Sequence, residues 1–186
     1  MGMQVNTQEH ATLSLLLSRE AIAARVKELA IQISRDYVGK DLLLVGVLKG
    51  AFVFLADLMR ALEMPVQIEF VRLASYGKGA TSAGHVRVIL DLEASIAGRH
   101  VLVVEDILDT GLTLGFLLER LRARQPASLK LCVLLSKRIK RIYDITPDYT
   151  GFDVPDDFVV GYGIDYAERY RSLPAIYTLS FPTSDA

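Results

Sequence analysis

The sequence predicts a single α/β domain built on a largely parallel, twisted sheet with helices on its faces. Short apolar runs alternate along the chain with longer segments whose apolar residues recur at helical spacing. Two of the runs, 42–48 and 129–136, are almost continuously apolar, as strands covered on both faces are. The chain has 186 residues, which is enough for one domain, 1–186, with a substantial core.

Composition indicates in which compartment the protein works and which classes of partner it does not favour. The formal net charge is −1, so no overall positive field attracts nucleic acid or an anionic membrane. Cys132 is the single cysteine, which excludes an internal disulfide framework and favours a reducing cytoplasmic location. No apolar run approaches the ~20 residues that a membrane span needs. The polar start, residues 1–12, lacks a secretory signal pattern, and we expect it to be a frayed, disordered end.

The first half of the chain predicts two helices and two strands. Ser18 is a good N-cap with Glu20 in the first helical turn, and Gly39 ends that helix. The elements that follow are a buried strand at 42–48, a helix at 51–62 and a strand at 66–76.

The second half continues the alternation. Its predicted elements are strands at 86–92 and 101–104, a helix at 113–124, a buried strand at 129–136, turns around Pro147 and Pro155, and short strands near 157–163 and 175–180. Residues 75–85 are rich in Gly, Ser and Ala with little to bury, so they predict a mobile loop.

Three acids gather where the strand at 101–104 ends. Glu105, Asp106 and Asp109 fall within five positions of an almost neutral chain. The ordinary explanation is that Asp109 or Thr110 caps the next helix while the other two acids are solvated. Against it, the acids stand at the edge of a predicted sheet, where α/β domains bind their ligands.

The residues after the acids add the features of a phosphate site. Gly111 lies where a turn needs an unusual φ or a close approach of the backbone, and Thr110 and Thr113 place hydroxyls beside it. The turn opens the helix predicted at 113–124, and N–H groups at a helix N-terminus favour phosphate. Acids that bind hydroxyls or a cation, beside a turn that binds phosphate, predict a site for a phosphorylated sugar.

Competing motifs fail on spacing. The chain has no G-x-x-x-x-G-K-[ST] phosphate loop. A D-x-D-x-T phosphatase motif has one residue between its acids, whereas two separate Asp106 from Asp109.

Two further clusters follow buried strands, Lys49 and Gly50 after 42–48 and Lys137 after 129–136. Since carboxyl ends of parallel strands share one edge, we expect these residues to lie near the acids. Taken alone, Lys49 would be a surface lysine and Lys137 one member of the solvated basic run KRIKR.

The chain resembles the hypoxanthine(-guanine) phosphoribosyltransferase family, within the purine type I phosphoribosyltransferases. The segment VLVVEDILDTGLTL is similar to that family's phosphoribosyl diphosphate motif. Other matching segments, in the same order as in the family, are VGVLKGAFVFLADL (45–58), SYG (75–77), LLSKR (134–138) and DFVVGYGIDYAERYR (157–171). The resemblance implies a type I phosphoribosyltransferase fold, with a small hood formed by the chain ends.

The implied reaction is purine salvage. The family transfers 5-phosphoribosyl from phosphoribosyl diphosphate to N9 of hypoxanthine or guanine, giving IMP or GMP and pyrophosphate, and it requires Mg²⁺. The resemblance assigns Glu105 and Asp106 to the ribose hydroxyls and a metal ion, and Asp109 to purine N7 as a general base. Residues 109–113 would hold the 5′-phosphate. Many relatives have a basic residue where this chain has Leu112, but backbone donors should preserve binding.

The resemblance also assigns the pyrophosphate side. Lys49 and Gly50 would hold pyrophosphate, and the Leu48–Lys49 peptide can be cis in the family. Arg171 would be a second anchor, against the alternative of a solvated charge.

On the purine side, Lys137 would donate to the 6-oxo group, which favours a 6-oxo purine over adenine. Phe158 would stack on the base, although a lone Phe is more often core, and the Val159 backbone would read the ring edge. Asp165 would lie near the 2-position and bind a second Mg²⁺ through water. Ser75 and Tyr76 would belong to a lid at 75–85 that closes during turnover.

Two alternatives stay open. One is an enzyme of the same class that prefers xanthine or guanine. The other is a non-catalytic, RNA-binding regulator of the same fold, which the near-zero net charge disfavours. Relatives are dimers or tetramers, so we expect a homodimer or homotetramer, with no nucleic acid or membrane partner.

Overall fold

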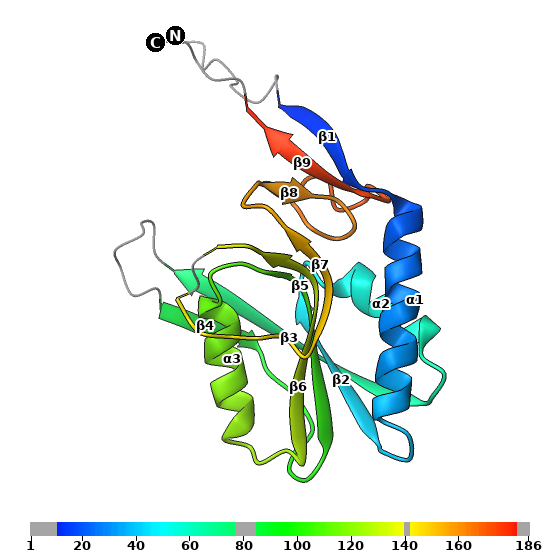
Figure 1. The fold of residues 1–186 in the computed structure, drawn as a ribbon. Helices are drawn as coiled ribbons and strands as arrows, with labels where there is room; N and C mark the ends of the chain where they lie inside the picture. Colours follow the sequence, from blue (N-terminus) through cyan, green and yellow to red (C-terminus); the bar gives the residue numbers. More distant parts are fainter. Residues whose placement is uncertain (1–10, 77–84, 140–141, 182–186) are drawn as a thin grey trace.

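A computed structural model describes residues 11–76, 85–139 and 142–181, and its ribbon is shown in Figure 1. A six-stranded sheet has the order β4-β3-β2-β5-β6-β7. Its strands are β2 (Leu42–Leu48), β3 (Val66–Tyr76), β4 (His85–Leu90), β5 (His100–Leu108), β6 (Ser128–Lys137) and β7 (Tyr149–Val154). All neighbours are parallel except β3 and β4. The predicted twisted, largely parallel sheet is confirmed.

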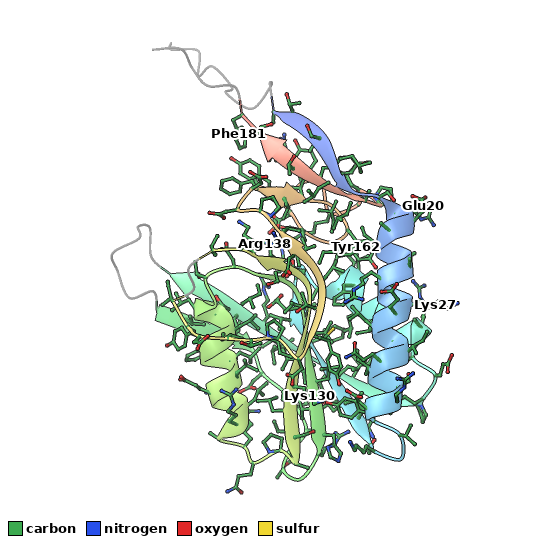
Figure 2. All side chains as sticks on the ribbon, viewed as in Figure 1. Glu20, Lys27, Lys130, Arg138, Tyr162 and Phe181 are labelled. Atoms are coloured by element: carbon green, nitrogen blue, oxygen red, sulfur yellow. The ribbon has the colours of Figure 1, made fainter. Side chains whose placement is uncertain are left out.

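Helices cover both faces of this sheet. Helices α1 (Arg19–Asp36) and α2 (Phe52–Ala61) lie on one face, and α3 (Leu112–Arg122) lies on the other (Figure 1). Successive side chains of each central strand point to opposite faces of the sheet. Leu44 and Leu102 pack in the core under α1 and α2, whereas Val45 and Val103 pack in the core under α3. Side chains fill the space between sheet and helices, while Lys27 points outward from α1 (Figure 2).

Three strands form the hood that the family resemblance implied. Strand β1 (Thr12–Leu17) pairs antiparallel with β9 (Ile176–Ser180), and β9 pairs with β8 (Val159–Val160). These strands lie beyond one end of the six-stranded sheet (Figure 1). Since β1 comes from the start of the chain and the other two from its end, the two ends of the chain build this part together.

The predicted helices begin and end within a few residues of the observed ones, and Ser18 caps α1 by accepting a hydrogen bond from Ala21 N at 3.2 Å. Three expectations need correction. The strand predicted at 101–104 extends to Leu108, so Glu105 and Asp106 lie within β5 rather than after it. Strands β1 and β7 were not expected. Thr12, expected in the frayed start, begins β1, while residues 1–10 lie outside the described residues.

No helix in the described part of the chain is long and apolar enough to cross a membrane.

Candidate active site

Two buried carboxylates stand near the carboxyl end of β5. Glu105 and Asp106 are each 8% exposed, and they are among the few buried charged residues of the described chain. The loop after β2 passes directly over them. A Cβ added to Gly50 would lie 1.7 Å from Asp106 Oδ2, so only a glycine leaves room for this carboxylate. The predicted meeting of Gly50 with the acids is therefore seen in the structure.

The environment of Glu105 disfavours its charged form. Burial, and then the neighbouring charge of Asp106, raises the pKa of Glu105 well above its usual value. The Asp106 N–H, which donates to Glu105 Oε1 at 3.2 Å, offsets this rise only in part. The Ile107 N–H donates to Asp106 Oδ1 at 3.0 Å. Buried acids in this state favour a cation or several hydroxyl donors as neighbours.

A phosphate-sized hollow lies next to these acids. It measures about 90 Å³ and is lined by residues 107–114 together with Glu105. Gly111 has a φ of 81°, a left-handed conformation that glycine adopts without strain, and it is the N-cap of α3. No side chain caps α3, so the N–H groups of its first turn, whose residues line the hollow, have no intrahelical acceptor. Asp109 and Thr110 lie exposed at its rim.

Lys137 lies on the opposite side of Asp109. Its side chain is only 11% exposed, and its Nζ lies 3.7 Å from Asp109 Oδ2. Asp156, which sequence reasoning missed, accepts a hydrogen bond from the same Nζ at 3.1 Å. The Nζ also stands 5.9 Å from the ring centroid of Phe158. Lys137 is therefore a held cation beside an aromatic face and not a member of a solvated run.

Phe158 is exposed at 66%, so the alternative of a core residue is wrong. Tyr166 meets it edge-on with ring centroids 6.5 Å apart, and Phe181 meets Tyr166 at 5.2 Å. Val159 follows in β8 and is buried, pairing with Thr178 of β9. The hood therefore presents one open aromatic face beside Lys137.

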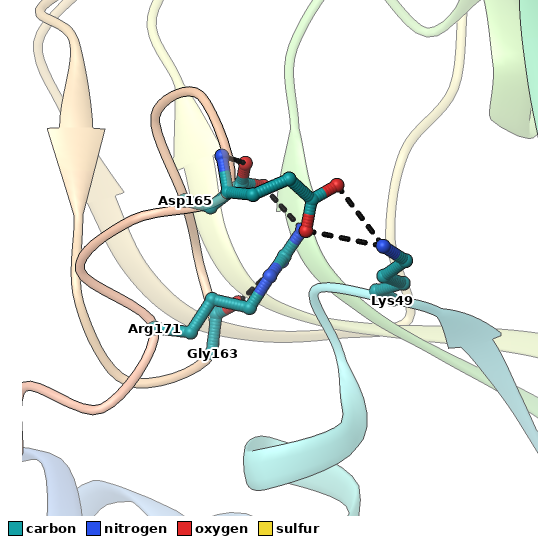
Figure 3. Close-up of polar contacts among 5 residues, drawn as sticks. Lys49, Gly163, Asp165 and Arg171 are labelled. Atoms are coloured by element: carbon teal, nitrogen blue, oxygen red, sulfur yellow. Dashed lines mark hydrogen bonds and ion pairs between the residues drawn. The ribbon is translucent and has the colours of Figure 1, made fainter.

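A second charged group contains Lys49, Asp165, Glu168 and Arg171 (Figure 3). The Leu48–Lys49 peptide is cis. Lys49 Nζ lies 3.0 Å and 3.1 Å from the two carboxylate oxygens of Glu168. Arg171 pairs with Asp165 at 2.6 Å and with Glu168 at 3.3 Å, and it donates to Gly163 O at 2.8 Å. Sequence reasoning predicted Lys49, Asp165 and Arg171 in this region but missed Glu168.

Close backbone packing joins the hood to the sheet at this point. A Cβ on Gly163, whose φ is 100°, would lie 2.3 Å from Gly50 O. Tyr162 beside it donates from its hydroxyl to Asp57 of α2 at 2.5 Å. Gly50 is thus enclosed by Asp106 on one side and by the 161–171 segment on the other. Gly50 therefore lies between the acids of β5 and the segment that carries the second charged group.

Magnesium ligands were predicted at Glu105, Asp106 and Asp165. Among the described residues, no three His, Cys, Asp or Glu side chains come close enough to hold a metal ion by themselves. Asp165 meets Arg171 and accepts a hydrogen bond from Glu168 N at 2.8 Å. This donor set fits Mg²⁺, which is usually bound by one or two carboxylates, waters and substrate oxygens.

Ser75 and Tyr76 are the last residues of β3, so the loop begins later than 75. Residues 77–84, the rest of the expected lid, lie outside the described residues, as do the side chains of Ser75 and Tyr76.

A larger, mostly apolar groove of about 940 Å³ lies between α1, α2 and residues 171–174. None of the acids or the phosphate-binding turn lines it. The candidate site is therefore the smaller, polar region at the carboxyl ends of the strands.

The phosphoribosyl transferase domain family matches residues 13–167. The hypoxanthine-guanine phosphoribosyltransferase of Mycobacterium avium is 50% identical over 172 residues, which cover 89% of this chain and 85% of the relative.

Solved structures agree in fold. A Bacillus anthracis hypoxanthine-guanine phosphoribosyltransferase matches with a TM-score of 0.85 and 44% identity over 92% of this chain and all of its own. A substrate-bound ternary complex of a Trypanosoma cruzi hypoxanthine phosphoribosyltransferase mutant matches with a TM-score of 0.85 and 46% identity, covering 92% of this chain and 97% of that one. The predicted type I fold and family are confirmed, and the chain belongs to the phosphoribosyl transferase family, among its hypoxanthine(-guanine) phosphoribosyltransferases.

Proposed function

We propose that this chain transfers the 5-phosphoribosyl group from phosphoribosyl diphosphate to N9 of hypoxanthine, and of guanine, releasing IMP or GMP and pyrophosphate. One observation carries the proposal. The buried acids Glu105 and Asp106 are followed within a few residues by the phosphate turn at the N-terminus of α3. Lys137 and the exposed ring of Phe158 lie on the purine side, and the cations Lys49 and Arg171 lie on the pyrophosphate side. Each group of the implied substrates thus has a matching partner.

The ribose and its phosphate would bind at the centre. The backbone N–H groups at residues 110–113, with the Thr110 and Thr113 hydroxyls, would hold the 5′-phosphate at the start of α3. Asp106 and Glu105 would accept hydrogen bonds from the ribose hydroxyls. Their negative charge would also favour the oxocarbenium-like ring that develops as pyrophosphate leaves. These acids, with Asp165 through water, would hold Mg²⁺, which would neutralise part of the diphosphate charge.

The purine would bind between Phe158 and the Lys137 side of the site. Lys137, fixed by Asp156, would donate to the 6-oxo group, and Phe158 would stack on the ring. Val159 would read the ring edge with its backbone, and Asp165 would lie near the 2-position. Asp109, 3.7 Å from the lysine, would accept the N7 proton as general base.

Pyrophosphate would leave from the other side of the acids. Lys49, Arg171 and the backbone at Gly50 would hold it. A lid that follows Ser75 and Tyr76 would exclude water from the reacting ribose. Leu112, in the first turn of α3, would contribute its backbone N–H and no charge.

The direct test is a set of initial rates with Mg²⁺, phosphoribosyl diphosphate and each of hypoxanthine, guanine, xanthine and adenine. Turnover of hypoxanthine with release of pyrophosphate supports the proposal. Xanthine as the preferred base favours the first alternative, and RNA binding without turnover favours a regulator.

We further propose a cytoplasmic homodimer or homotetramer, following the family. Light scattering on a sizing column measures the mass, and a monomer under assay conditions would contradict this assembly.

A further inference from the structure

Glu168 lies between the two cations that the proposed function assigns to pyrophosphate. Its oxygens stand 3.0 Å and 3.1 Å from Lys49 Nζ, and one of them stands 3.3 Å from Arg171 (Figure 3). Glu168 therefore contacts the same two cations that, under the proposed function, would bind pyrophosphate. The binding of pyrophosphate by Lys49 and Arg171 does not by itself explain why Glu168 pairs with both of them.

The loop that carries Glu168 is shaped to direct it there. Ala167, Glu168 and Tyr170 have φ values of 50°, 61° and 74°, a left-handed conformation that residues other than glycine seldom adopt. Glu168 N also donates to Asp165 Oδ2 at 2.8 Å, which fixes the backbone next to the carboxylate. Three such residues within four positions form a tight turn that brings the side chain back over the site.

The contact is strong enough to form and open enough to be replaced. The side chain of Glu168 is 66% exposed and that of Lys49 is 45% exposed, so solvent screens the pair. Asp165 also pairs with Arg171, so two carboxylates balance two cations. A diphosphate carries more negative charge than Glu168 and can replace it.

We propose that Glu168 is the resident counter-ion of the pyrophosphate-binding cations, which occupies Lys49 and Arg171 in the empty enzyme and returns to them when pyrophosphate leaves. The inference rests on the proposed function, specifically on the binding of pyrophosphate by these cations. Glu168 competes with the diphosphate for the same donors, so it weakens diphosphate binding and favours release. When the site is open in only a fraction of the molecules, the apparent affinity is the intrinsic affinity multiplied by that fraction.

The competition is specific to one ligand group. IMP has no pyrophosphate, and its 5′-phosphate lies in the turn at 109–113, so its affinity should not depend on Glu168. Pyrophosphate and phosphoribosyl diphosphate should both depend on it.

The test is calorimetric titration of pyrophosphate with Mg²⁺, and separately of IMP, into wild-type and E168Q protein. Glutamine keeps the size of the side chain and removes its charge. Glycine is unsuitable because it would also relax the left-handed backbone. We expect E168Q to bind pyrophosphate about threefold to tenfold more tightly, in line with the loss of two exposed ion pairs. Its affinity for IMP should not change, and the difference for pyrophosphate should shrink at high salt.

Glu28→Gln is the matched control. It removes the same charge from an exposed glutamate that pairs with Arg25 at 2.6 Å on α1. It should leave the affinity for pyrophosphate at the wild-type value, and a similar gain would attribute the effect to net charge and overturn the inference.

Lys49→Gln separates the inference from the proposed function. If K49Q weakens pyrophosphate binding while E168Q leaves it unchanged or weaker, the cations are assigned correctly and Glu168 is only a structural part of the loop. If neither K49Q nor Arg171→Gln weakens pyrophosphate binding, the assignment of the cations is wrong and the inference fails with it. If the inference holds, the double variant E168Q/K49Q should show a smaller gain than E168Q alone.

Discussion

Gly50 lies so close to Asp106 that the carboxylate occupies the place where a side chain at position 50 would begin. A Cβ there would lie 1.7 Å from Oδ2 and 2.5 Å from Cγ. The backbone of the pyrophosphate side and the acids of β5 therefore share one contact, and a side chain at position 50 would displace the Asp106 carboxylate.

Gly50→Ala should lower kcat/KM by about 10²-fold, because displacing a reacting group by about 1 Å has that cost. Steady-state rates with hypoxanthine measure the change. Gly46→Ala is the control on the adjacent strand, where the new Cβ would meet Leu55 Cδ2 at 2.6 Å in an apolar core. That variant should lose melting temperature and keep the kcat/KM of its folded fraction. Equal kcat/KM losses in both variants would remove the special role of Gly50.

Adenine should be used at least ~10⁴-fold less efficiently than hypoxanthine, because a mismatched donor pair leaves buried polar groups without partners. Lys137 is the donor, held at 3.1 Å by Asp156. Lys137→Gln removes the cationic donor, which weakens hypoxanthine use, and its carbonyl can accept from the 6-amino group of adenine, so the ratio should fall. Comparable kcat/KM values for both bases in the wild-type enzyme would contradict the role of Lys137.

Asp109→Asn should lower kcat by about 10²–10⁴, the usual range for a general acid–base group. Phosphoribosyl diphosphate should still bind within about tenfold, because Asn keeps the size and one acceptor of the side chain. Thr113→Ala should do the opposite, raising the KM of that substrate more than it lowers kcat. If Asp109→Asn keeps a near-normal kcat and only loosens the phosphorylated substrate, Asp109 is a structural cap.

Asp91 provides a pH-dependent test away from the site. Burial raises the pKa of Asp91, but hydrogen bonds from Arg120 and Arg124 outweigh it and lower the pKa to about 2. A lowered acid pKa means that stability is present above the unfolded value of about 3.9 and is lost as the pH falls toward 2. Asp91→Asn should therefore lower the free energy of unfolding by about 1 kcal/mol at pH 7, after solvent screening.

Urea unfolding at pH 7 and pH 3 measures this effect. The gap between wild type and Asp91→Asn should narrow at pH 3, and purine turnover at pH 7 should be retained. The control Glu93→Gln should show a smaller loss at pH 7. A gap that stays constant between the two pH values would exclude the ion pairs as its cause.

The central strands and helices could be predicted from sequence because their signals are local. Periodicity and the cap at Ser18 place α1, and continuous apolar runs place β2 and β6. Strand β1 gave no such signal, because most of its residues are exposed and the strand is defined by its pairing with β9, where Thr12 lies opposite Ser180. Strand β7 lies between Pro147 and Pro155, which local reasoning interprets as turns.

Some residues of the site could likewise be predicted from the sequence, and others could not. The acids and the phosphate turn are contiguous in sequence, so their chemistry is visible there. Asp156 and Glu168 were missed because each is defined by a cation far away in the chain, Lys137 or Lys49. Acids in exposed segments are common, and only the fold shows which ones meet a functional lysine. The contact between Gly50 and Asp106 is likewise a fact of three-dimensional packing.

The pairing of β1 with β9 sets an order of assembly. All strands of the six-stranded sheet and the phosphate turn are made by Val154, although the core on the α1 and α2 face is completed only by later residues such as Ile164 and Ile176. The three-stranded sheet cannot close until Ser180 reaches Thr12. Phe158 and Arg171 lie in the region that closes last, so a newly made chain should first acquire its ribose and phosphate contacts and only later its purine and pyrophosphate contacts.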